Sequence, residues 1–314
     1  MARISPKQHL VSSADEEHVK SDGVSALERG FRVLDCFVAA SKPLSNSEVA
    51  ELTGIPRPSV TRLIATLVAL GHLRPAQASE RWELAAGVVR LARSFLGTLN
   101  IRDYAREHLR SLAEAIDASS FLGVRDGLDV LVVEAARSSA AVAVMSADVG
   151  TRMSLARSAL GRAWLLGLDP ESRAVVLGQL QAADVVTDKQ KMALSKSLAS
   201  TQELGYIVSV GEWHPAINAA AVPVCTADGQ IVSLNCGGPA FMLTEAKLRD
   251  WVVPRLLQAA QALAHDIGGL AGPALTCPSK SVEAKQTLTS SIHKTRQRPD
   301  STKETKRNGA DNTT

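Results

Sequence analysis

The spacing of apolar residues near the N-terminus predicts three helices followed by a β-hairpin. From Val24 onward the pattern acquires helical periodicity, and one face of the first helix collects several apolar side chains. These are Leu27, Phe31, Leu34, Phe37 and Val38. Gly54 and Gly71 stand where the second and third helices should end, because glycine readily takes the left-handed conformation at a helix end. Short extended stretches at 72–74 and 81–84 then predict the hairpin.

The second helix has a complete start signal. Ser45 can cap the helix, and Glu48, three residues later, can reach back to the amide of Ser45. Leu44 and Val49 flank this capping box and are expected to pack together as a hydrophobic staple. The pattern therefore fixes the beginning of this helix.

Farther along the chain, helical and extended patterns alternate, which predicts an α+β fold for the larger C-terminal part. Helices are expected at 101–116, 156–166, twice within 170–204 and at 244–267. Strands are expected at 120–124, 130–134, 141–145, 205–210, 218–225 and 231–236.

These patterns divide the chain into five segments. We expect a flexible N-terminal arm at 1–23, a winged helix-turn-helix at 24–85 and a linker helix at 86–100. A sensor-type domain should cover 101–270. The last segment, 271–314, is rich in Ser, Thr and Lys and is predicted to be a disordered basic tail.

Composition narrows the class of protein. The 314 residues carry a formal net charge of only +3, so any affinity for nucleic acid must come from a local surface. The four cysteines show no C-x-x-C spacing, which argues against a zinc knuckle or a disulfide framework and favours a reducing compartment. No run of about 18 apolar residues suggests a membrane span. We therefore expect the cytoplasm.

The third helix carries the clearest functional signal. The segment from Arg57 to Arg74 contains no Asp or Glu, and an acid-free face suits a polyanion such as DNA. In a winged helix-turn-helix the second helix of the motif enters the major groove, where Arg, Ser and Thr can contact bases or phosphates. The candidate DNA contacts are Ser45, Ser47, Arg57, Ser59, Thr61, Arg62, Thr66, Arg74 and Arg81.

At these positions the sequence resembles the IclR-type bacterial transcription regulators. The resemblance rests on the stretches SALERG at 25–30, LSNSEVAE at 44–51, TGIPRPSVTRLIATL at 53–67, LGHL at 70–73 and RWEL at 81–84. It continues in ALGRA at 159–163, ELGY at 203–206 and AVPV at 221–224, and it covers about Val24 to Gly269. Pro58 departs from the small polar residue that the family often has there.

The resemblance implies a GAF-like effector domain, dimers or tetramers, and control of a catabolic operon by a small organic or aromatic acid. Since one recognition helix reads few base pairs, a pseudo-palindromic operator is expected. Relatives often have an acid at Ser209, Cys at Ala219 and Ser at Asn235, so the effector is left open. The candidate effector residues are Ser158, Ala159, Gly161, Ser209, Glu212, Trp213, Asn218, Ala219, Asn235 and Gly237.

Several alternatives stay open at this point. Trp213 could stack on an aromatic ligand or anchor a half-buried loop. Glu212 and His214 could join a metal site, but a third ligand would have to be remote, so no metal or cofactor is expected. An enzyme is also conceivable, with Cys225 or Cys236 as nucleophile, although no base or catalytic motif accompanies either cysteine. A small-molecule sensor with a degenerate DNA-binding domain is the third alternative.

Overall fold

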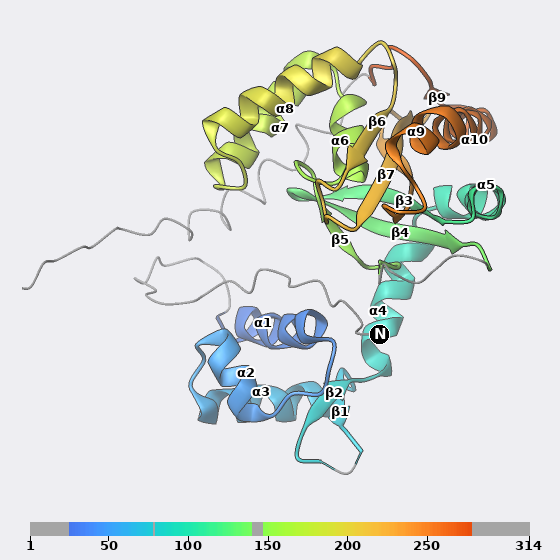
Figure 1. Cartoon of the computed structure of the whole chain (residues 1–314). Helices are drawn as coiled ribbons and strands as arrows, with labels where there is room; N and C mark the ends of the chain where they lie inside the picture. The colour runs from blue at the N-terminus through green and yellow to red at the C-terminus, as the bar shows by residue number, and fades with distance from the viewer. Residues whose placement is uncertain (1–24, 78, 140–146, 278–314) are drawn as a thin grey trace, which may run out of the picture.

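The computed structural model describes residues 25–77, 79–139 and 147–277. A small helical domain at the N-terminal end is joined by one helix to a larger domain built around a sheet (Figure 1). The small domain contains α1 (Ser25–Ala40), α2 (Asn46–Thr53), α3 (Arg57–Ala69), β1 (Leu73–Pro75) and β2 (Trp82–Leu84). The two strands pair antiparallel, and this confirms the predicted winged helix-turn-helix.

Local signals in the sequence explain the helical domain. The Ser45–Glu48 capping box is present, and Gly54 ends α2 with a φ of 69°, in the left-handed region. Leu44 and Val49 lie in the same buried cluster, as the staple predicts. In α1, however, Phe37 points into this core, whereas Leu27, Phe31 and Val38 remain exposed.

Helix α4 (Ala86–Gly97) leads into the larger domain, whose sheet is antiparallel throughout. The strand order is β5-β4-β3-β8-β7-β6, with β9 pairing to β7. The strands are β3 (Ser119–Asp126), β4 (Asp129–Arg137), β5 (Arg152–Ser154), β6 (Ile207–Val210), β7 (Ile217–Cys225), β8 (Ile231–Pro239) and β9 (Leu270–Ala271). The helices are α5 (Ile101–Ile116), α6 (Ala159–Leu166), α7 (Pro170–Ala182), α8 (Asp188–Thr201), α9 (Glu245–Lys247) and α10 (Val253–Asp266), with a π-helical turn at Leu248–Val252.

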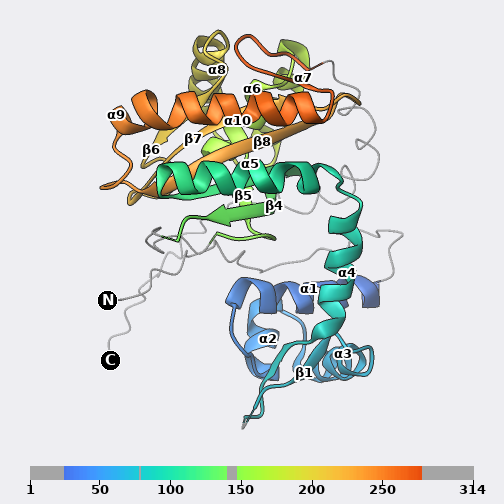
Figure 2. The same cartoon turned by 90° about the vertical axis from the view of Figure 1, so that its right-hand side faces the viewer.

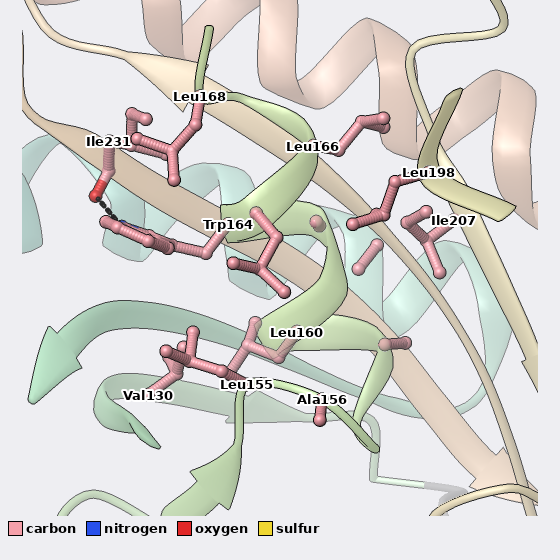
Figure 3. Packing of buried hydrophobic residues seen from close by; sticks show 14 of the residues in the cluster. Val130, Leu155, Ala156, Leu160, Trp164, Leu166, Leu168, Leu198, Ile207 and Ile231 are labelled. Carbon is pink, nitrogen blue, oxygen red and sulfur yellow. Dashed lines mark hydrogen bonds between the residues drawn. The ribbon is translucent and has the colours of Figure 1, made fainter. Parts of the chain in front are cut away.

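Helices cover both faces of this sheet. Helices α5 and α10 lie side by side on one face, and α6 to α8 lie on the other (Figures 1 and 2). The alternation of side chains along β7 shows the two cores: Ala220 and Val222 pack toward α5 and α10, whereas Ala221 packs toward α6. On the α6 face, Trp164 fills the centre and donates its indole N–H to the carbonyl of Ile231 at 3.0 Å (Figure 3).

Some predicted element bounds need correction. The helix expected at 156–166 begins at Ala159, because Ser158 caps it by accepting the amide of Gly161. The last helix does not run unbroken through 244–267, since a π-helical turn interrupts it. The strand expected at 141–145 lies outside the described residues.

The expected boundary of the disordered tail is wrong. Residues 270–277 form a strap that returns to the sheet: β9 pairs with the end of β7, and Leu275 and Cys277 are buried. The cysteine spacing argued against a disulfide framework, but Cys225 and Cys277 form one disulfide. Their sequence separation of 52 leaves no local motif that spacing could reveal. The arm at 1–23 and the tail beyond Cys277 lie outside the described residues.

Candidate DNA interface and effector site

The outward face of α3 presents the predicted DNA contacts. Val60, Ile64 and Leu67 anchor the helix in the core, which turns the opposite face to solvent. The exposed residues on that face are Arg57, Thr61, Arg62 and Thr66, with Ser59 half-buried. No carboxylate interrupts this face of α3, so its charge is positive.

Asn46 holds α3 and the wing in register. Its Nδ2 donates to Thr61 Oγ1 at 2.9 Å, and its Oδ1 accepts the indole N–H of Trp82 at 2.8 Å. The backbones of Leu44 and Trp82 also exchange two hydrogen bonds. Our sequence analysis did not single out Asn46, although a polar residue directly after the cap and an aromatic residue in the wing were visible.

Arg81 fixes the wing to the start of α2 rather than projecting freely. Its guanidinium donates to the carbonyl of Pro43 at 3.0 Å and lies 2.9 Å from a carboxylate oxygen of Glu48. The backbone amide and side chain of Ser45, with Arg81, lower the pKa of Glu48 to about 2. Ser45 and Arg81 are therefore occupied within the domain, whereas Ser47 remains exposed.

An open cleft of about 630 Å³ lies beside the wing. Lys42, Arg74 and Arg81 contribute cations to its lining, together with Pro43 and Ser79. Arg74 pairs across the hairpin with Glu83 at 2.8 Å, but two-thirds of its side chain remains exposed. Three cations against the one carboxylate of Glu83 leave the lining positive on balance, which suits a wing that contacts a phosphate backbone.

A row of facing residues crosses the sheet beneath α6. Opposed residues of antiparallel strands point to the same face, and the register aligns one residue from each of five strands. These residues are Ser209, Ala219, Gly237, Ser119 and Arg137. The adjacent row contains Ile207 and Phe121, which pack in the α6 core, so the aligned row faces α6 as well.

Several predicted effector residues meet at this row. Ser209 is 3% exposed, and its hydroxyl has no hydrogen-bond partner among the described residues. Asn235 lies in the adjacent row and donates to the carbonyl of Ala220, while its Oδ1 accepts nothing within the described residues. Ala219 and Gly237, which lie in this row, have small side chains that leave space above the sheet. Ser158 and Ala159 begin the helix above it.

The structure does not bring the other candidates into the same position. Asn218 points to the opposite face of the sheet, where its amide donates to the carbonyl of Leu243 at 2.8 Å and accepts the amide of Gly211. Gly161 is required for close packing, since a Cβ there would lie 2.4 Å from Leu155 Cα. Arg137, at the β4 end of the row, was missed because we ended this strand at Glu134.

The loop between β6 and β7 closes one side of the site. Glu212 forms an ion pair with Arg162, one turn into α6. Trp213 is half-buried and tilted against His214, whose ring nitrogen Nδ1 accepts the amide of Ala216 at 3.2 Å. Both members of the hypothetical metal pair are thus engaged with protein groups. Within the described ranges, no three His, Cys, Asp or Glu side chains gather as metal ligands.

The cysteines considered as nucleophiles do not suit that role. Cys236 is fully buried, and this burial raises the pKa of its thiol strongly, which disfavours the reactive thiolate. Cys225 is held in the disulfide. Among the helices that the structure describes, none is long and apolar enough to cross a membrane.

A winged helix-turn-helix joined to a separate α+β domain defines the class of DNA-binding transcription regulators with a sensor domain. The chain matches the IclR helix-turn-helix domain over residues 26–76 and the C-terminal domain of the bacterial transcriptional regulator IclR over residues 93–265. It therefore belongs to the IclR family of transcription regulators, and its relatives are regulators rather than enzymes.

Individual relatives agree with this assignment. The chain is 28% identical over 261 residues to the HTH-type transcriptional regulator TsaQ1/TsaQ2 of Comamonas testosteroni, covering 82% of this chain and 93% of the relative. It is 25% identical to the p-hydroxybenzoate hydroxylase transcriptional activator of Acinetobacter baylyi, covering 82% and 97%. The crystal structure of an IclR family regulator from Brucella abortus superposes with a TM-score of 0.65 at 32% identity, covering 82% and 97%.

Proposed function

We propose that the protein binds a pseudo-palindromic operator, and that a small organic or aromatic acid in the effector domain controls this binding and hence a catabolic operon. The observation that carries the proposal is that the chain combines two surfaces. One is the acid-free face of the recognition helix with Arg57 and Arg62, and the other is the polar part of the sheet with Ser209 and Asn235, beneath the start of α6. As a DNA-binding regulator, the protein would work in the cytoplasm.

The DNA half of the proposal depends on the two arginines of α3. Neither pairs with an acidic side chain within the described part of the chain, and both side chains are exposed. Arg57 and Arg62 should contact base edges or adjacent phosphates, with Thr66 and Ser47 beside them. Arg74 in the wing should add a contact to the phosphate backbone that is independent of sequence.

Footprinting on the DNA beside the protein's own gene tests this half. R57A and R62A should each weaken specific binding by about 1–3 kcal/mol, or roughly 5- to 150-fold. R110A is the matched control, because Arg110 lies exposed on α5 and pairs with Glu107 far from the wing. Unchanged operator affinity in both α3 variants would contradict the assignment.

The effector half depends on where an acid could bind. A carboxylate above the row would lie near the start of α6. The amide of Gly161 is already bound to Ser158 Oγ, so the amides of Ala159 and Leu160 are the donors left for a ligand. Arg137 could supply a cation from the β4 end, since 41% of its side chain is exposed. Its guanidinium now donates to the carbonyl of Ala147 and pairs with Asp148 at 3.4 Å, and an acid would compete with these two contacts. The Acinetobacter relative is named for an enzyme of an aromatic acid, which supports the aromatic alternative.

Thermal unfolding of the full chain with a panel of aliphatic and aromatic carboxylates tests this half. A binding acid should raise the unfolding temperature with increasing ligand concentration. S209A should change the ranking among acids, and R137A should weaken binding of every acid in the panel, while R110A should match the wild type. If a folded wild-type protein responds to none of the carboxylates, the acid effector is wrong.

A further inference from the structure

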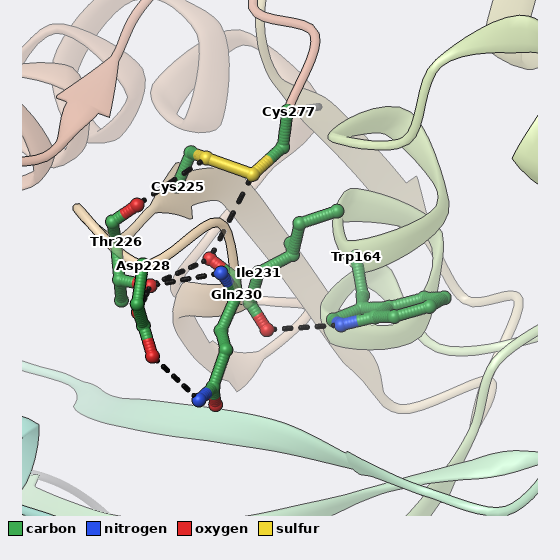
Figure 4. The surroundings of a disulfide bond; sticks show 7 residues. All are labelled: Trp164, Cys225, Thr226, Asp228, Gln230, Ile231 and Cys277. Carbon is green, nitrogen blue, oxygen red and sulfur yellow. Dashed lines mark hydrogen bonds between the residues drawn. A yellow bond between two sulfur atoms is a disulfide. The ribbon is translucent and has the colours of Figure 1, made fainter. Parts of the chain in front are cut away.

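The C-terminal strap, residues 270–277, is fastened to the effector domain at several points. The amide of Ala274 donates to the carbonyl of Gln202, and the side-chain amide of Gln202 donates to the carbonyl of Leu275 at 2.8 Å. At the end of the strap, Cys277 is bonded to Cys225 at the end of β7, with 5.6 Å between their Cα atoms (Figure 4). That separation lies within the ordinary range for a disulfide.

The strap also completes the C-terminal end of α6. The amide of Cys277 donates to the carbonyl of Gly167 at 2.9 Å, and Leu168 and Cys277 form a parallel bridge. The buried guanidinium of Arg173 binds the carbonyls of Leu165, Leu166 and Leu168 together with Gln202. The helix that begins at the proposed effector site therefore ends against the strap.

A disulfide is unusual in this setting. DNA-binding regulators work where the DNA is, and thiols in such compartments are kept reduced, so disulfides found there are usually transient and redox-sensing. Cys277 stands at the end of a short strap held by few backbone hydrogen bonds, whereas Cys225 ends β7, which pairs there with β8 on one side and with β9 of the strap on the other. Local opening of the strap beyond β9 would expose Cys277 while β7 stays paired with β8.

We propose that Cys225 and Cys277 form a reversible oxidation site that reacts with low-molecular-weight disulfides and fastens the strap to the end of α6. The Cys277 thiolate attacks one sulfur of glutathione disulfide, whose S–S bond breaks, and one glutathione thiolate leaves. The Cys225 thiolate then attacks the Cys277 sulfur and expels the second glutathione. The two electrons pass to glutathione disulfide, and the two cysteine protons end on the glutathione thiols.

The two oxidation states should differ in stability and in local protection. The linkage closes a long loop, and it should raise the unfolding temperature of the effector domain by about 5–10 °C. Reduction should speed amide hydrogen exchange at Ala274 and Cys277 by about tenfold or more, because their hydrogen bonds then depend on the strap's own packing. Exchange in the core of β7 should stay slow in both states.

Full-length protein equilibrated in glutathione buffers of graded redox ratio tests the proposal. Acid quenching, thiol labelling and peptide mass spectrometry should find the Cys225–Cys277 linkage in excess glutathione disulfide and two free thiols in excess glutathione. Failure to form the linkage at any ratio would overturn the proposal. A linkage that persists in excess glutathione after prolonged incubation would also overturn it, since such a disulfide would be structural and not reversible.

Two variants keep the result interpretable. C36A/C236A removes the two free cysteines and should retain the redox dependence in full. C277S should exchange at Ala274 as fast as the reduced wild type in both buffers. Either of two results would contradict the proposed redox linkage of the strap: a C277S protein whose strap still responds to oxidation, or a wild type whose exchange at Ala274 is equal in both states. None of these readouts depends on DNA or an effector, so the proposed function stands or falls separately.

Discussion

Trp82 of the wing donates its indole N–H to Asn46 Oδ1 at 2.8 Å, so the wing is attached to the first residue of α2. The same amide side chain donates to Thr61 on the recognition helix. One side chain thereby sets the position of α3 relative to the wing. Because both elements must meet the same DNA, Asn46 helps to keep their contacts in register, together with the backbone hydrogen bonds between Leu44 and Trp82.

Replacing Asn46 should loosen the wing before it unfolds the domain. N46A leaves the half-buried Trp82 N–H without its partner and should cost about 1–3 kcal/mol of local stability. Hydrogen exchange of the Leu44 and Trp82 amides, which bond across the same junction, measures this directly. N46D keeps the acceptor for Trp82 but loses the donor to Thr61, so it should fall between wild type and N46A. Equal protection in all three proteins would show that Asn46 is dispensable.

The lowered pKa of Glu48, caused first by its hydrogen bonds to Ser45 and then by Arg81, predicts a pH dependence. The folded pKa of Glu48 is lowered from 4.5 to about 2, so its stabilising contribution is complete above about pH 4.5 and is lost as the pH falls toward 2. E48Q keeps the capping hydrogen bond but cannot ionise. Urea unfolding of the helical domain should show wild type more stable than E48Q at pH 7, with the difference shrinking between pH 5 and pH 3. A constant difference across that range would exclude ionisation of the Glu48 carboxylate as its cause.

The sequence predicted the helical domain more fully than the effector site, for a physical reason. Caps, glycine ends and helical periodicity are local signals, and in α2 they place each boundary. The effector row instead depends on strand register, which joins Ser209 to Arg137 across five strands and cannot be read from one segment. The same limit hid the Cys225–Cys277 linkage, which joins residues 52 positions apart.

Gly161 offers a test of packing at the start of α6. An added Cβ would meet Leu155 Cα and the carbonyl oxygen of Ser154, both at 2.4 Å, and backbone cannot move aside as a flexible side chain can. G161A should therefore destabilise the effector domain by about 1–3 kcal/mol despite alanine's higher helix propensity. G178A is the matched control, because a Cβ in α7 meets nothing within 4 Å and should stabilise by up to about 1 kcal/mol. Thermal unfolding of both variants decides the comparison, and a G161A protein as stable as wild type would refute the steric argument.

Pairing of two chains is expected to use α4 and the exposed part of α1. Leu91 and Phe95 lie one turn apart on α4 and are 57% and 46% exposed, and Phe31 on α1 is 56% exposed. Phe37 on α1 is buried within its own domain and is unavailable. Apolar side chains in such numbers along a linker helix favour a contact with another copy, and a two-fold dimer would match a pseudo-palindromic operator.

Charge placed on that face should separate the dimer. In a two-fold interface each substitution occurs twice, and burying one Leu or Phe contributes about 1.5–3 kcal/mol. L91K/F95K should therefore weaken self-association at least about 100-fold. R93A, on the opposite side of α4 by helical periodicity, should leave it unchanged.

Light scattering at micromolar concentration, paired with footprinting, should show the double variant as a monomer that protects one half-site poorly. A double variant that keeps the wild-type mass would place the dimer contact elsewhere, and a wild type of monomeric mass that protects a single asymmetric half-site would reject the dimer itself.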